Sequence, residues 1–149
     1  MRPGTENVPG IVGFHQAAKL AMANAAQDQA TMRELRDLLI ERCMSSLAPV
    51  SLNGDATSRL CNNASLNFHG ARAEILLHML EAENLFVSSG AACHASNKKP
   101  SHVLQAIGLD KDEGTLRLTL CRHTTKDEID AAIRVLHQVV PEARNLSQM

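Results

Sequence analysis

A cysteine surrounded by small and polar residues is the first candidate for chemistry in this sequence. Cys93 lies within residues 88–97, SSGAACHASN. The glycine and two alanines before it leave room for close approach to another surface. His94, Lys98 and Lys99 supply or can supply positive charge, which favours the nucleophilic thiolate. A lone cysteine often serves only as a small buried apolar residue, but the surrounding loop composition predicts that Cys93 is a nucleophile.

Metal binding is the other sulfur chemistry open to such a residue. The sequence has no CxxC pair, and its four cysteines are widely spaced: Cys43, Cys61, Cys93 and Cys121. Neither Cys93-His94 nor Cys121-Arg122-His123 matches the usual zinc-ligand spacing, so a thiol-based metal site is the weaker alternative. HExxH, P-loop and GxGxxG motifs are absent. Without a secretory signal, the thiols are expected to be free rather than paired in disulfides.

Arg117 is the second candidate, because it stands in an alternating run, TLRLTL, at residues 115–120. Successive strand side chains point to opposite faces, so the three leucines can face a core while Arg117 faces away from it. A solvated surface arginine would give the same pattern. The planar guanidinium is also the side chain best suited to hold a carboxylate through two hydrogen bonds. The pattern therefore predicts either a surface residue or a carboxylate-binding arginine.

A third candidate is Thr5, which follows Gly4 shortly before a predicted helix. A hydroxyl and a backbone N–H ahead of a helix N-terminus can bind a phosphate group. The remaining histidines, His15, His69, His78, His102 and His137, mostly follow helical or strand patterns. We interpret these histidines as structural.

Composition bounds the class of protein. The chain has 149 residues, of which 44% are hydrophobic and 21% charged, as expected for one soluble globular domain. A net charge of −1, with three Phe and no Tyr or Trp, gives no basis for binding nucleic acid or an anionic membrane. The sequence shows neither a membrane-spanning apolar window nor a signal peptide. We therefore expect a cytoplasmic or mitochondrial protein that is not secreted.

The elements that position these residues follow from periodicity and turn signals. Apolar residues at helical spacing predict a long helix over residues 11–48, after turn-forming residues 1–10. Alternating and amphipathic runs then predict, in order, strands 50–53 and 64–68, helix 73–80, strand 85–87, helix 100–107, strand 115–120 and a last helix. This order predicts an α+β fold over residues 49–149, with helices on a short mixed or antiparallel sheet.

The last helix has the clearest start signal. Thr125 and Glu128 have the spacing of a capping box. A buried stripe is predicted to follow, and Pro141 is expected to end the helix. The stripe consists of Ile129, Ile133, Leu136 and Val140.

The predicted helix is longer than a small domain can cover. About 37 helical residues would span roughly 55 Å, which exceeds the width of a small domain. The first half of the helix is rich in alanine and can pack closely on another surface. We expect that surface to lie outside this chain.

Four blocks of this sequence, taken in order, resemble the C-terminal part of the cysteine desulfurases. The blocks are RPGTENVPGIVG, SSGAACHAS, KPSHVLQAIGL and LRLTLCRHTTKDEID. These enzymes are pyridoxal-phosphate-dependent, have the class V aminotransferase fold and include the selenocysteine lyases. The resemblance implies the small C-terminal domain of a fold-type I enzyme. It also implies that residues 1–10 belong to the junction with a cofactor domain and that the helix over 11–48 runs between the two domains.

The resemblance also implies a chemistry. Cys93 matches the family's loop cysteine, which removes sulfur from L-cysteine to leave alanine and an enzyme persulfide. Arg117 matches the arginine that binds the substrate carboxylate. Thr5 matches the threonine that contacts the cofactor phosphate of the neighbouring subunit, so a homodimer is implied, together with a protein that accepts the sulfur.

Several positions depart from the family pattern. The common SSGSAC reads SSGAAC, and the common GR before the last helix reads Cys121-Arg122. The family's cofactor lysine lies upstream of the first block, and no lysine of this chain matches it. Two alternatives therefore remain open. One is selenocysteine lyase, which acts on L-selenocysteine and which the GAACH run also resembles. The other is a non-catalytic, stand-alone small domain.

Overall fold

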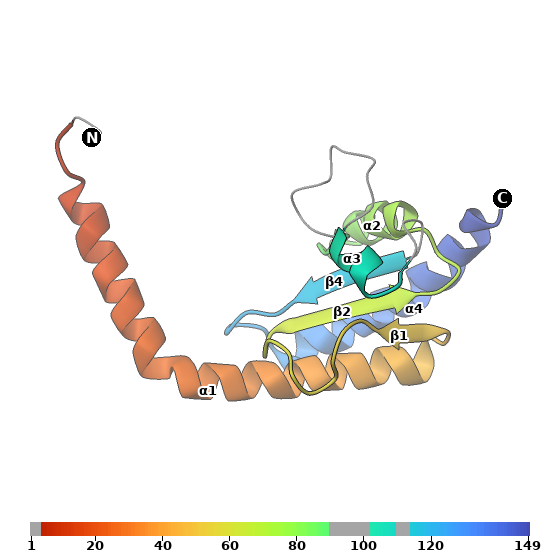
Figure 1. The fold of residues 1–149 in the computed structure, drawn as a ribbon, viewed down its shortest axis with the longest axis horizontal. Helices are drawn as coiled ribbons and strands as arrows, with labels where there is room; N and C mark the ends of the chain where they lie inside the picture. Colours follow the sequence, from red (N-terminus) through yellow and green to blue (C-terminus); the bar gives the residue numbers. More distant parts are fainter. Residues whose placement is uncertain (1–3, 90–101, 110–113) are drawn as a thin grey trace.

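The structure, a computed structural model, describes residues 4–89, 102–109 and 114–149. It confirms the α+β prediction: helices pack on one antiparallel sheet whose strand order is β1-β2-β4-β3 (Figure 1). In chain order the elements are α1 Val8–Ser46, β1 Val50–Leu52, β2 Asn63–Phe68, α2 Ala73–Ala82, β3 Ser88–Ser89, α3 His102–Ala106, β4 Gly114–Thr119 and α4 Lys126–Ser147. No helix among the described residues is both long and apolar enough to cross a membrane.

The core lies on one face of the two central strands. Leu66 and Phe68 of β2 and Leu116 of β4 are fully buried there, as strand alternation predicts. The helices α1, α2 and α4 contribute the other side of this core, for example through Leu39, Leu76 and Leu136. Burial of each such leucine stabilises the fold by about 1.5–3 kcal/mol. The opposite face of the sheet is free to carry polar residues.

The long helix is confirmed, but it begins three residues earlier than predicted. The side chain of Asn7 accepts a hydrogen bond from the Gly10 N–H at 3.1 Å and caps α1. Pro9 then lies in the first turn, where its missing N–H costs no intrahelical hydrogen bond. The proline and glycine that suggested a turn are therefore part of the helix.

The two halves of α1 have different surroundings. Leu39 and Cys43 in the second half are buried against the sheet and α4. The first half bends away and projects from the rest of the molecule (Figure 1). Its large apolar side chains are exposed: Val8, Ile11, Val12, Phe14, Leu20 and Met22. The prediction that this half needs a partner outside the chain is consistent with that exposure.

The capping box of α4 is confirmed, whereas the predicted end at Pro141 is wrong. The Thr125 hydroxyl accepts from the Glu128 N–H at 3.2 Å, and the Glu128 carboxylate accepts from the Thr125 N–H at 2.7 Å. The helix then continues through Pro141 to Ser147. Packing outweighs the one lost hydrogen bond, because Ala143 is fully buried beyond the proline.

The strand predicted at residues 85–87 is also misplaced. The Leu85 N–H donates to the Leu80 carbonyl at 2.9 Å and so closes the end of α2. The ladder with β4 begins only at Ser88, which pairs with Arg117. Periodicity located the extended segment but not the residues that enter the sheet.

Candidate functional site

Arg117 lies at the centre of the polar face of the sheet. Its neighbours in the ladder are Ser65 of β2 and Ser88 of β3, which oppose it from either side. Leu116 and Leu118 point to the buried face, so the prediction that Arg117 faces away from the core is confirmed. The side chains that flank the arginine are therefore small hydroxyls.

The guanidinium of Arg117 has neither a hydrogen bond nor an ion pair within residues 4–89, 102–109 and 114–149. The residue is half-buried. A cation in such a position normally has an acceptor, because partial burial without one is costly. The site is therefore suited to an anionic group such as a carboxylate.

Sequence reasoning missed the polar residues that share this face. Ser65 is the acceptor for the side-chain amide of Asn53 at 3.2 Å, and Asn53 is itself buried. Asn67, two residues along β2, is fully buried beside Thr115 of β4. The alternation of residues 64–68 contained this signal, since its small and polar members fall on one face and its apolar members on the other.

The candidate nucleophile, Cys93, lies outside the described residues. The last described position before it is Ser89, at the end of β3. Ser88 and Ser89 pair with Arg117 and Leu116. The chain thus leads toward Cys93 from the edge strand that adjoins the arginine.

Thr5 is not brought near this face. It is exposed and precedes α1, whose first turn lies at the far end of the projecting half-helix (Figure 1). Residues 4–10 around it are all exposed, so they enclose no group there, and the predicted role of Thr5 is untested. Pyridoxal phosphate therefore does not fit a site built from the described residues of this chain alone.

The described thiols have contrasting environments. Cys43 is fully buried, and this burial raises the pKa of its thiol to about 12. Cys121 is exposed, and hydrogen bonds from the His123 backbone N–H and the Thr124 hydroxyl hold the pKa of its thiol below the ordinary value. Both of these cysteines and Cys61 are free, as predicted. Among the described residues, no group of three or more His, Cys, Asp or Glu side chains could hold a metal ion.

Comparison with known families decides where this fold belongs. The family model described as aminotransferase class-V matches residues 1–132. The chain belongs to the class V aminotransferase family. Among its relatives, "Cysteine desulfurase IscS" of Methanosarcina thermophila is 41% identical over 99% of this chain. "Cysteine desulfurase" of Trichormus azollae is 38% identical over 98%. The chain spans 37% of the length of each of these two relatives.

Solved structures of two NifS-like proteins agree with the fold. A "NIFS-LIKE PROTEIN" superimposes with a TM-score of 0.79 at 28% identity, over 95% of this chain and 36% of that protein. The NifS-like protein from Rickettsia africae gives a TM-score of 0.78 at 27% identity, over 94% and 36%. The sheet and its helices therefore match about a third of each of these NifS-like proteins.

Proposed function

We propose that this chain is the C-terminal part of a cysteine desulfurase. The reaction converts L-cysteine and the Cys93 thiol into L-alanine and a persulfide on Cys93. The carbon–sulfur bond of the substrate breaks and a sulfur–sulfur bond forms on Cys93. The electron pair of the broken bond stays with the substrate carbon, which gains a proton, so the reaction requires no external oxidant or reductant.

The observation that carries this proposal is the half-buried Arg117 with no anionic partner among the described residues. Its role is to hold the substrate carboxylate and so orient the sulfur toward Cys93. The two Ser neighbours of Arg117 in the ladder leave space for that carboxylate, because a hydroxymethyl group is short. The relatives also support it: proteins named cysteine desulfurases match nearly the whole length of this chain.

Pyridoxal phosphate belongs to the proposal, since it supplies the electron sink for chemistry at an amino acid. The lysine that binds it lies outside this chain in our proposal. Thr5 would contact the cofactor phosphate of a partner subunit in a homodimer. The persulfide on Cys93 would then pass to an acceptor protein.

The test joins this chain to the part of the Methanosarcina thermophila relative that this chain does not match. With pyridoxal phosphate and L-cysteine, the chimera should release alanine and carry a persulfide on Cys93, measured by mass spectrometry. Cys93→Ser should abolish both, whereas Cys121→Ser, at an exposed thiol, should abolish neither. The 149-residue chain alone should show no turnover. Activity that survives Cys93→Ser in the chimera contradicts the proposal.

The same chimera separates the alternatives. If kcat/KM for L-selenocysteine greatly exceeds that for L-cysteine, the chain comes from a selenocysteine lyase, a class of enzyme that the GAACH run also resembles. If a correctly folded chimera binds cofactor but turns over neither substrate, the non-catalytic small domain is the better description.

A further inference from the structure

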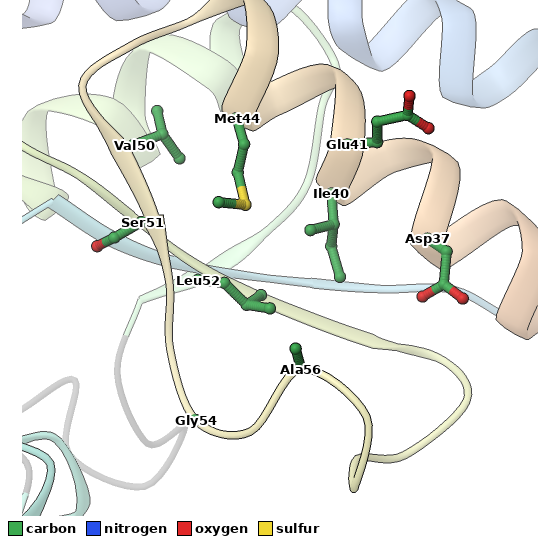
Figure 2. A pocket seen from close by; sticks show the side chains of 9 residues that line it. All are labelled: Asp37, Ile40, Glu41, Met44, Val50, Ser51, Leu52, Gly54 and Ala56. Atoms are coloured by element: carbon green, nitrogen blue, oxygen red, sulfur yellow. The ribbon is translucent and has the colours of Figure 1, made fainter.

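A groove of about 500 Å³ runs between the second half of α1 and the edge strand β1, on the helix-covered side of the sheet (Figure 2). Ile40 and Met44 point from the helix toward Leu52 and Val50 of the strand. Met44 is 43% exposed beside these apolar side chains. The groove therefore has an apolar floor that the described residues leave open.

The strand beside the groove has backbone groups available for pairing. The Asn53 N–H donates to Ser65, and the His69 N–H donates to Pro49, on either side of β1. Hydrogen-bonded and non-bonded pairs alternate in an antiparallel ladder, so the N–H and C=O groups of Val50 and Leu52 point away from β2. They have no partner within the described residues. An added strand could pair with them.

The charged residues that line the groove limit the kind of segment that could pair with β1. Its charged lining residues, Asp37 and Glu41, are both acidic and lie one helical turn apart. Asp37 is paired with Arg36 at 2.6 Å, but its side chain is still 55% exposed. Glu41 has no ion pair among the described residues. A second copy of the chain would bring these acids near their own counterparts, which disfavours self-pairing through β1.

We propose that the α1–β1 groove binds an extended segment of a partner protein, which adds a strand to β1. Alternate apolar side chains of this segment fill the groove over Ile40 and Met44. A lysine or arginine reaches Glu41 and the exposed side of Asp37. Main-chain hydrogen bonds to Val50 and Leu52 provide affinity, and the groove provides specificity.

The test uses this 149-residue chain, labelled with ¹⁵N, and a basic peptide probe, acetyl-Ser-Val-Thr-Val-Thr-Lys-Ser-amide. Saturable amide shifts at Val50 and Leu52, with slower hydrogen exchange at both amides, are the expected result. The same peptide with Glu in place of Lys should bind more weakly by roughly three- to tenfold.

Two surface variants of the chain locate the site. Glu41→Lys should weaken the basic peptide by roughly three- to tenfold, and Met44→Gln should weaken it to a similar extent. Glu142→Lys on α4, an equal charge change at an exposed position, should leave binding unchanged. Far-ultraviolet circular dichroism checks that each variant is folded.

Absence of shifts at millimolar peptide, shifts confined to another surface, or equal binding of the acidic peptide would overturn the proposal. If the Val50 amide shift changes with the concentration of the chain alone, without peptide, the groove binds a second copy of the chain and the proposal is overturned. The readout requires neither cofactor nor turnover. The groove also lies on the opposite face of the sheet from Arg117, so this result is independent of the proposed desulfurase activity.

Discussion

Arg117 is half-buried between two serines and has no acceptor among the described residues. A bound substrate carboxylate would supply that acceptor. In the desulfurase chimera, Arg117→Ala should lower kcat/KM for L-cysteine by roughly 10- to 100-fold, because a charge-assisted contact is lost. Arg122→Ala, at an exposed arginine bonded to His123, is the matched control and should have little effect. Unchanged steady-state kinetics for Arg117→Ala would remove the carboxylate role.

The exposed Cys121 thiol has a lowered pKa, which predicts its reactivity. Alkylation requires the thiolate, so Cys121, whose pKa is lowered, should react with iodoacetamide at a lower pH than an ordinary thiol. Thr124→Val should raise the pH midpoint of this labelling, since the thiolate loses a donor. Labelling is followed by mass spectrometry from pH 6 to 10. Thr119→Val, at an exposed position on β4, should leave the midpoint in place.

Cys43 should behave in the opposite way. It is fully buried with a pKa of about 12, so it should stay unlabelled in the folded chain and react only in urea. The unfolded thiol ionises near its ordinary value of 9.0. Stability from the buried neutral thiol is therefore complete below pH 9 and is lost as the pH rises toward 12. Cys43→Ala should show a shallower decline in unfolding free energy between pH 9 and 11.

At the scale of elements, Arg144 joins the end of α1, the start of β1 and the end of β2 to α4. Its guanidinium donates to the carbonyls of Leu47, Ala48, Pro49 and His69 at 2.8–3.1 Å. A lysine cannot reproduce this planar arrangement of donors. Four backbone carbonyls therefore accept hydrogen bonds from one side chain.

Arg144→Lys should lower the free energy of unfolding by about 1–3 kcal/mol, measured by urea denaturation. Arg134→Lys is the same change at an exposed position of the same helix and should cost much less. Equal losses in the two variants would mean that the four carbonyl contacts contribute nothing beyond the general effect of the exchange.

At the scale of the whole molecule, the projecting half of α1 is the least supported part of the described chain. Its side chains are mostly exposed through residue 24, whereas Leu39 and Cys43 are buried. An isolated helix of this length is only marginally stable in water. This half would be covered by a second body in the longer enzyme that we propose.

Hydrogen exchange should therefore be fast at residues 12–24 of the isolated chain and slow at residues 36–46. The chimera should slow exchange in the first range without changing the second. Equal protection of both ranges at micromolar concentration would indicate that the first half is already covered, for example by self-association. Sedimentation velocity would distinguish that case.

Local sequence patterns were enough to predict the fold class, the capping box at Thr125 and the face on which Arg117 lies. These follow from local alternation and capping chemistry, which operate over a few residues. The sequence also contains the four blocks that resemble the cysteine desulfurases. It misplaced the ends of α1 and α4 and the strand at 85–87.

Those boundaries and the partners of each site residue depend on packing between segments that are distant in the sequence. Local propensity predicts that α4 ends at Pro141. The helix instead continues beyond it, where Ala143 is buried and Arg144 donates to backbone carbonyls of other segments. Ser65 and Arg117 pair although they are more than 50 positions apart in the sequence. The periodicity of each strand does not reveal which residues of two strands lie opposite each other. The open α1–β1 groove was likewise invisible in the sequence, because a surface between two elements exists only once they pack.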